Sequence, residues 1–407
     1  MNGSENESLR RPNKGAIRGG GRFRLPTVLR VLPTLATLTL CGALAGACGR
    51  SPYSIADSSP TPTATITTSP TVGNFLYSSN FGDGKVGVFT RNVSTGALAF
   101  VGPAGAGSAN GPMGIANGPS AKFLYVANSA DNNVRQYKIN QTTGQLAKIG
   151  SGTIAAGSSP QWIAVTPNVQ FAFAINSGDG TITPYTINAT TGALTANGTA
   201  FSSLQLKKPA AAVASNKWLY VTDATKGTIV SFPIGATGIP AAGTTTVLSG
   251  SAVPGPAIMD PTGKFVYVTD QSFGVVYFLT VGTGGLTLTG TYNPSANGEG
   301  GLAIGTTSST NEFLFVANQL LPTPSISVFQ VNGDGSLSTP ALYPDASLNL
   351  PTGVVVDPTG VFLYVANQGN GTISQFAINP TTGALSAGVP FATESASSGP
   401  LFLALGQ

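Results

Sequence analysis

Short stretches of the chain alternate apolar and polar side chains, and each stretch ends at an Asn or Asp that small or polar residues follow. The clearest example runs from Val361 to Asn367, passes through the Gly-rich segment 368–371, and alternates again from Thr372 to Ile378. Alternation with a period of two among β-branched and aromatic residues predicts strands, and the Gly and Asn between them predict tight turns. We therefore expect a unit of strand, tight loop, strand, turn and further strand over residues 361–385.

The same unit recurs at a nearly constant spacing. Copies aligned on the polar residue that ends the second strand lie 47 to 49 residues apart, at Asn80, Asn128, Asn176, Asp223, Asp270, Asn318 and Asn367. An aromatic residue follows in the third strand of each copy, at Phe89, Tyr137, Tyr185, Phe232, Phe278, Phe329 and Phe376. A turn of the form Asn-x-x-Thr-Gly-x-Leu begins at Asn92, Asn140, Asn188 and Asn379. One such unit cannot bury its own faces, so seven copies predict a stacked repeat with the aromatic residues packed between units.

A shorter apolar segment precedes each second strand except the first. These segments cover 112–116, 160–165, 209–213, 256–259, 301–304, 351–356 and 400–405. The last has no partner after it, and the second strand at 75–77 has none before it, so pairing the two would close a ring and hide the sheet edges. We predict an all-β fold: a seven-bladed β-propeller over residues 72–407, with four antiparallel strands per blade and the C-terminal strand completing the first blade.

The net charge of +4 comes from the N-terminus. Residues 1–47 hold seven Lys or Arg and two Asp or Glu, whereas residues 48–407 hold twelve and thirteen, a balance of −1. A nearly neutral body lacks the basic footprint of a nucleic-acid-binding protein. We expect no nucleic-acid partner.

Neither cysteine lies in the repeats, and the chain contains no histidine. Cys41 and Cys48 both fall at the end of an N-terminal apolar run. Their positions exclude disulfides, thiolate catalysis and Cys-based metal sites within the repeats. The missing histidine removes the commonest metal ligand and the commonest general base near neutral pH. We expect neither a metal nor a cofactor.

The N-terminal segment has the layout of an export signal. A polar, basic stretch precedes the apolar run Val31–Ala47, which is short for a membrane span. Leu44 to Cys48 resembles a bacterial lipoprotein box, which predicts lipidation of Cys48; cleavage without a lipid is the alternative. Residues 48–71 are rich in Ser, Thr and Pro and predict a flexible tether. We expect an exported, monomeric protein of the cell envelope that meets the membrane only through a lipid anchor.

The face with the longer loops is the predicted binding face, because variable loops on a rigid scaffold carry most binding sites. Arg135 lies early in a third strand, where it could bind a carboxylate or phosphate or be a solvated strand-edge cation. Gln161 and Trp162 open an inner strand, and Trp162 could stack on a sugar ring or lie in the core. Lys207 precedes the next inner strand, in a position that also suits a solvated loop residue.

Acidic and amide residues on the same face have structural interpretations. The seven aligned Asn and Asp residues could form a ligand ring, but side chains of this type commonly bond nearby backbone and tolerate left-handed conformation. Asp83 and Asp179 lie in Gly-Asp-Gly sequences, which predict hairpin turns before calcium ligands.

The pattern Phe-Leu-Tyr-Val-Ala-Asn, followed by the third strand and Asn-x-x-Thr-Gly-x-Leu, resembles the lactonase family of seven-bladed propellers, which includes 6-phosphogluconolactonase-like enzymes. It is also similar to surface propellers with Tyr-Val-Thr-Asn repeats. The resemblance implies hydrolysis of a sugar lactone. Enzymatic members carry Pro-Arg-His at an inner strand and an acid after a second-strand Asn, where this chain has Pro160-Gln161-Trp162 and Gln319.

Two functions therefore remain open. In the first, the chain is a lactonase in which Glu299 is the base and Arg135 the oxyanion donor. In the second, it is a non-catalytic envelope propeller that binds a carbohydrate, a peptide or a protein partner, with Gln319 among its ligand-binding residues.

Overall fold

The computed structural model describes residues 75–104, 111–118, 121–294, 299–307, 310–319, 323–392 and 398–406. These residues form strands and turns; none of them belongs to a helix that could cross a membrane. The predicted export signal (1–47), Cys48 and the tether (48–71) lie outside the described residues.

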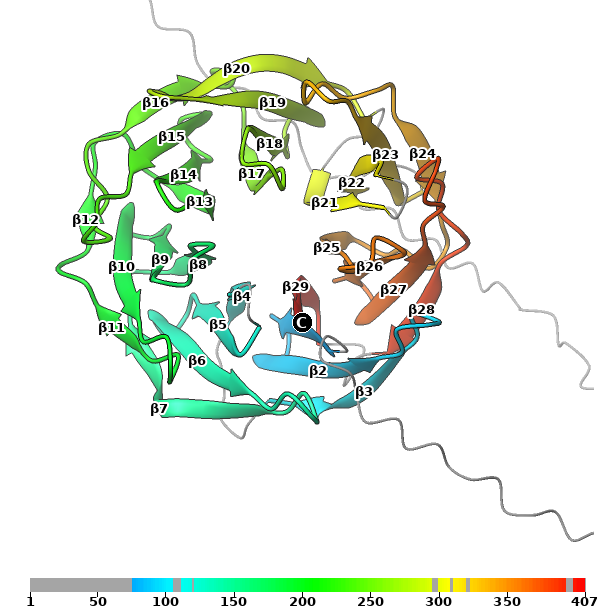
Figure 1. The fold of residues 1–407 in the computed structure, drawn as a ribbon, viewed down its shortest axis with the longest axis horizontal. Coiled ribbons are helices and arrows are strands. Elements are labelled where there is room, and N and C mark those ends of the chain that lie inside the picture. The colour runs from blue at the N-terminus through cyan, green and yellow to red at the C-terminus, as the bar shows by residue number, and fades with distance from the viewer. Residues whose placement is uncertain are drawn as a thin grey trace, which may run out of the picture. The chain divides into compact units, whose positions relative to one another are not determined.

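Seven antiparallel sheets surround a central axis, which confirms the predicted seven-bladed propeller (Figure 1). The inner strands are β4 (Pro112–Asn117), β8 (Pro160–Val165), β13 (Pro209–Ala214), β17 (Pro254–Met259), β21 (Glu299–Thr306), β25 (Pro351–Val356) and β29 (Pro400–Gly406). The second strands are β5 (Phe123–Asn128), β9 (Phe171–Asn176), β14 (Trp218–Asp223), β18 (Phe265–Asp270), β22 (Glu312–Asn318), β26 (Phe362–Asn367) and β1 (Phe75–Asn80). Six inner strands begin with Pro, a residue suited to the first position of a strand because it cannot donate to the ladder.

The outer half of each blade is less regular. The third strands are β6 (Asn133–Ile139), β10 (Thr181–Ile187), β15 (Thr228–Pro233), β19 (Val275–Gly282), β23 (Ser325–Val331), β27 (Thr372–Ala377) and β2 (Lys85–Arg91). The outer strands are β7 (Leu146–Ala155), β11 (Leu194–Ala196), β12 (Phe201–Ser202), β16 (Thr244–Val247), β20 (Gly285–Tyr292), β24 (Ala341–Pro344), β28 (Val389–Ala392) and β3 (Leu98–Pro103). Both β11 and β12 pair with β10, so one blade has a divided outer edge.

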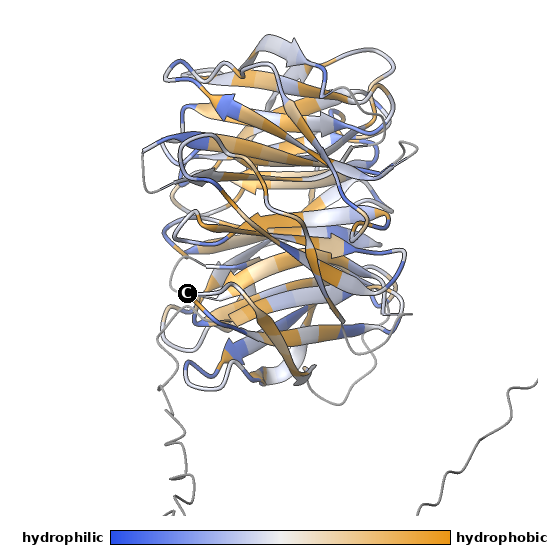
Figure 2. Cartoon of the chain, turned by 90° about the vertical axis from the view of Figure 1, so that its right-hand side faces the viewer, coloured by the Kyte–Doolittle hydropathy of each residue, from blue (hydrophilic) through white to orange (hydrophobic). Residues whose placement is uncertain are grey.

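The ring closes as predicted. Strand β29 pairs antiparallel with β1, with Phe75 opposite Gly406 and Tyr77 opposite Ala404. The blade therefore has the order β29-β1-β2-β3, built from both ends of the propeller sequence. We call the side with the loops between second and third strands the loop face, and the side with the turns between first and second strands the turn face. Hydrophilic residues gather at both faces, and hydrophobic residues in the strands between them (Figure 2).

The predicted aromatic packing between blades is correct for all seven copies. In six of them, the third-strand aromatic is buried in a cluster shared with the preceding blade, as Tyr137 is with Tyr77. The seventh, Phe278, pairs with Tyr267 and packs toward the following blade. Leu279 takes the equivalent position instead, opposite Val266. Neighbouring side chains of a strand point to opposite faces. An aromatic residue one position earlier in the strand therefore packs at the other junction of its blade.

Six of the recurring turns contact the preceding blade through a glycine with positive φ. A Cβ on any of these glycines would come within 2.2 to 2.6 Å of an aromatic ring, in the pairs Gly96–Phe362, Gly144–Phe75, Gly192–Phe123, Gly238–Phe171, Gly335–Phe265 and Gly383–Phe313. At four junctions a tyrosine hydroxyl also donates to the carbonyl of the same glycine, as Tyr77 does to Gly144 at 2.9 Å. The Thr-Gly turn therefore recurs because it joins neighbouring blades.

The ring of Asn and Asp residues is structural. All seven are fully buried at the ends of the second strands. Asn367, for example, donates through Nδ2 to the hydroxyls of Thr372 and Ser374 in the third strand. None of the seven has a positive φ, so the expected left-handed conformation lies elsewhere: in five blades a glycine four residues later carries it. These side chains fasten the loop to the blade and do not project into the central passage.

Candidate functional site

The inner strands surround a central passage, and we call the level between its two cavity-bearing halves the waist. At this level five blades contribute Gly114, Ala211, Pro256, Gly301 and Gly353. A Cβ on Gly301 would lie 2.4 Å from the carbonyl oxygen of Thr352, and one on Gly353 2.5 Å from that of Leu401. Glycine is required at these two positions because the adjacent inner strand lies too close for a Cβ.

The two remaining positions of the waist are aromatic. Trp162 of β8 and Phe402 of β29 flank Gly114, and their rings meet edge to face with centroids 4.9 Å apart and planes at 82°. This geometry is a favoured one for aromatic pairs. Trp162 lines cavities on both sides of the waist. The pair thus separates the passage into a loop-face half, the bowl, and a turn-face half, the tube.

The bowl consists of two adjoining cavities of about 540 and 270 Å³, which share Met113, Pro256, Gln271 and Phe402. The larger volume is in the size range of small-molecule sites. Trp162, Phe402 and Met113 supply an apolar wall. Gln161, Gln271, Gln319, Gln368, Lys208 and Thr352 supply polar groups.

Three of these glutamines occupy one register position in consecutive blades. Gln271, Gln319 and Gln368 each follow directly the buried Asp or Asn that ends a second strand. Their side chains are exposed or half-buried, and within the described residues none of the three amides has a hydrogen bond. Each amide can donate two hydrogen bonds and accept two. The result is an arc of available amides opposite the aromatic wall.

Charge is scarce in the bowl. Among the described residues that line it, Lys208 is the one charged side chain. The neighbouring Lys207 is exposed and lines neither cavity, while the backbone N–H groups of both lysines donate to the carboxylate of Asp223. Glu299 begins β21, with its backbone opposite Asn318, but its side chain lies outside the described residues.

The predicted site residues thus separate into two groups. Gln161, Trp162 and Gln319 come together in the bowl, where Gln161 Nε2 donates to Ser159 Oγ at 3.2 Å. Arg135 does not join them: it is buried in β6, with Nη1 3.5 Å from the hydroxyl of Tyr137, and lines neither cavity of the bowl.

The acidic loop residues stabilise turns through hydrogen bonds. Asp179 Oδ1 accepts hydrogen bonds from the N–H and hydroxyl of Thr181, and its Oδ2 accepts one from the N–H of Ser158. Asp345 accepts from the N–H groups of Ser347 and Gly388; burial opposes ionisation, but these bonds hold the pKa of its carboxyl below the usual range. Over the described part of the chain, no three His, Cys, Asp or Glu residues are grouped to hold a metal ion.

Among the residues of the bowl that were not predicted are Gln271, Gln368, Phe402 and Met113. Gln271 and Gln368 share the register of Gln319, so extending that position to all seven copies would have identified them. Phe402 holds the same inner-strand position as Trp162, and Met113 the same position as Gln161. In each case the residue is found by its equivalent position in the repeat.

Solved structures share this fold at low sequence identity. A periplasmic gluconolactonase from Pseudomonas aeruginosa is 18% identical, with a TM-score of 0.68 over 83% of this chain and 99% of that chain. A Bacteroides uniformis protein, provisionally described as a 6-phosphogluconolactonase, is 19% identical, with a TM-score of 0.69 over 82% of this chain and 100% of that chain. A Lactobacillus plantarum protein gives the same identity and TM-score over 83% of this chain.

A search of curated proteins found no match. The family model described as lactonase, 7-bladed beta-propeller, matches residues 52–154, 150–301 and 285–396, which together span most of the chain. The blades described above account for nearly all of that span. The chain therefore belongs to the lactonase family of seven-bladed β-propellers.

Proposed function

We propose that this chain binds an uncharged, polyhydroxylated small molecule, a sugar or a sugar lactone, in the bowl. The observation that carries the proposal is the arc of three glutamine amides, Gln271, Gln319 and Gln368, opposite Trp162 and Phe402. Sugars present hydroxyl groups around the ring edge and C–H groups on the ring face. Amides satisfy the first, and an aromatic wall packs against the second.

Neutral donors and acceptors also favour an uncharged ligand. Lys208 provides one positive charge at the edge of the bowl, without the bidentate guanidinium group that selects phosphates and carboxylates. A phosphorylated ligand would leave most of its charge without a partner here. We expect the free sugar or lactone to bind more tightly than its phosphate ester.

Binding without chemistry is better supported than hydrolysis. The chain has no histidine, and the described lining of the bowl offers no carboxylate. Arg135, the predicted oxyanion donor, is buried in β6 outside the bowl. A lactonase requires both a base that activates water and a donor for the developing oxyanion.

One observation favours a lactonase as a second candidate. The backbone of Glu299 pairs with Asn318, and the next residue, Gly300, lines the bowl. In this candidate the Glu299 carboxylate would take a proton from water as the water oxygen adds to the lactone carbonyl. The ring C–O bond would then break, and the proton would pass to the leaving alkoxide oxygen.

Both candidates are tested on the same purified propeller. Calorimetric titration with glucose, glucono-δ-lactone and the 6-phosphate of the lactone measures binding, and a pH-stat measures lactone opening. Saturable binding of the unphosphorylated compounds without turnover above the spontaneous rate supports a binding protein. Turnover that Glu299→Gln abolishes would establish the lactonase instead. No binding to any of the three would refute the ligand class.

We also propose that the protein is exported and anchored through a lipid on Cys48 as a monomer of the cell envelope. The basic and apolar N-terminal segments support export, as does the periplasmic location of the similar gluconolactonase. Mass spectrometry of the N-terminal peptide tests the anchor. A mature N-terminus at acylated Cys48, absent in Cys48→Ser, is expected; an unmodified peptide that begins at another residue would contradict it.

A further inference from the structure

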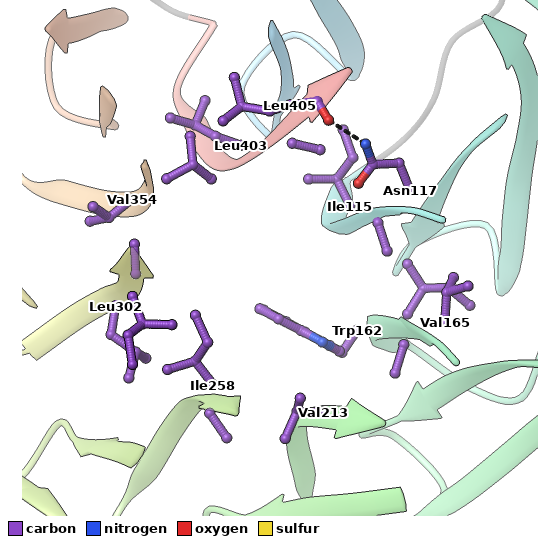
Figure 3. Close-up of a pocket in the computed structure, with 18 of the residues that line it drawn as sticks. Ile115, Asn117, Trp162, Val165, Val213, Ile258, Leu302, Val354, Leu403 and Leu405 are labelled. Atoms are coloured by element: carbon purple, nitrogen blue, oxygen red, sulfur yellow. Dashed lines mark hydrogen bonds between the residues drawn. The ribbon is translucent and has the colours of Figure 1, made fainter. Parts of the chain in front are cut away.

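The tube differs from the bowl in its side chains, which are almost all apolar. Three successive positions of each inner strand surround it, in three rings of seven residues, and all of these except Met259 line the cavity. The rings are Ile115, Ile163, Ala212, Ala257, Leu302, Val354 and Leu403; Ala116, Ala164, Val213, Ile258, Ala303, Val355 and Ala404; and Asn117, Val165, Ala214, Met259, Ile304, Val356 and Leu405. Twenty of these twenty-one side chains are apolar. Figure 3 shows most of the lining residues, Trp162 among them, arranged around a common space.

The one polar side chain in the three rings is already engaged. Asn117 donates through Nδ2 to the carbonyl oxygen of Leu405 in the neighbouring inner strand (Figure 3). The side chains of the lining therefore offer water few hydrogen-bond partners. Apolar side chains around a cavity favour apolar occupants, as in an engineered cavity of roughly 150 Å³ that stays dry and binds benzene.

The dimensions of the tube limit its occupant to a small molecule. Its volume is about 530 Å³, and two residue steps along a strand place the first and third rings about 7 Å apart. Trp162 lines the end nearest the waist, and Pro358, in the turn after β25, lines the turn-face end. This space is too small for a helix or for a second copy of the chain.

We propose that the tube is a second binding site, which takes a short, neutral aliphatic chain. The absence of charged side chains among its described lining residues disfavours ionic ligands, and the single engaged amide disfavours sugars. Branched aliphatic side chains from all seven blades can pack around a flexible chain without a required orientation. The site is distinct from the bowl, because the waist lies between them.

The probe is 1-octanol, titrated into the full propeller carrying Trp218→Phe, so that Trp162 is its single tryptophan. We expect a saturable change in Trp162 fluorescence and calorimetric heats with a negative heat-capacity change, the signature of apolar burial. Ile258 and Ala116 are both partly exposed to the tube. Ile258→Gln should weaken binding at least tenfold by making the wall polar, and Ala116→Phe should do so by filling the space.

Val247→Gln is the matched control, because Val247 is 60% exposed on an outer strand and lies outside the tube. It should bind 1-octanol like the parent. Far-ultraviolet circular dichroism and thermal unfolding show whether each variant keeps the fold, and sugar binding in the bowl should be unchanged in all of them. A linear, non-saturable response, or full affinity in both tube variants, would overturn the proposal. Failure of sugar binding would leave it unaffected, since the two readouts are independent.

Discussion

Arg91 and Asp357 form a buried ion pair across the junction at which the ring closes. Nη1 of Arg91 in β2 lies 3.1 Å from Oδ2 of Asp357, in the turn after β25, and the two side chains are 3% and 0% exposed. The equivalent positions of the six other blades hold Ile or Val: Ile139, Ile187, Ile234, Val281, Val331 and Ile378. The first and last blades are thus joined both by β29 and by a contact that the other junctions lack.

Loss of Asp357 should destabilise the ring more than loss of Asp260. Both carboxylates accept hydrogen bonds from their own Asp-Pro-Thr-Gly turns, but only Asp357 also faces an arginine. Removing one partner of a buried pair typically costs about 3–5 kcal/mol. We expect Asp357→Ala to lower the free energy of unfolding in urea more than Asp260→Ala does. Equal losses would contradict a role for the pair in closure.

The glycine that contacts the preceding blade should not tolerate a side chain. Gly144 has a φ of +73° and a Cβ there would lie 2.3 Å from Phe75, so Gly144→Ala should lower stability by several kcal/mol. Gly150 also has a positive φ but has open space around it. Gly150→Ala should therefore show the backbone cost alone, roughly 1 kcal/mol. Thermal unfolding of the two variants compares them; similar losses would mean that the ring contact is unimportant.

The junction between the fourth and fifth blades lacks this contact, and Tyr220 shows the consequence. The turn after β19 is shorter, nothing lies near a Cβ built on Gly284, and the buried hydroxyl of Tyr220 has no hydrogen-bond partner in the described structure. Burial raises the pKa of Tyr220 to about 12. Tyr220→Phe should thus be neutral or stabilising, whereas Tyr77→Phe should cost about 1–2 kcal/mol by leaving the carbonyl of Gly144 unsatisfied. Denaturant unfolding of both variants tests the contrast, and an equal cost would refute it.

Asp270 should contribute to acid sensitivity. Burial opposes ionisation of its carboxyl, but hydrogen bonds from Ser272, Tyr277 and the N–H of Val253 hold its pKa below the usual range. A folded-state pKa below the unfolded value of about 3.9 stabilises the fold at neutral pH. That stabilisation is lost as the pH falls below about 4 through the folded pKa. Asp270→Asn should flatten the acid limb of unfolding free energy against pH; an unchanged limb would exclude this carboxyl.

The repeat made the architecture predictable, because spacing, alternation and the two unpaired terminal strands admit few arrangements. The direction in which a strand side chain points was harder to predict. Phe278 appeared equivalent to its aromatic counterparts, but it lies one residue nearer to the Asp that ends its second strand, so its side chain points to the other junction. Arg135 was placed correctly along its strand, yet its burial depends on packing against neighbouring blades. The glutamine arc was only partly predicted. A family position pointed to Gln319, whereas Gln271 and Gln368 share only its place in the repeat.

The arc of amides in the bowl is the central feature of the proposed binding site. Calorimetric titration of glucose or glucono-δ-lactone into the parent, the three single variants Gln271→Ala, Gln319→Ala and Gln368→Ala, and their triple combination tests it. Gln330→Ala, on the exposed end of β23, is the control. Each amide should contribute about 1 kcal/mol, so each single variant should weaken binding about fivefold and the triple variant about a hundredfold, with the control unchanged. Parent-like affinity in the triple variant would contradict the proposed site.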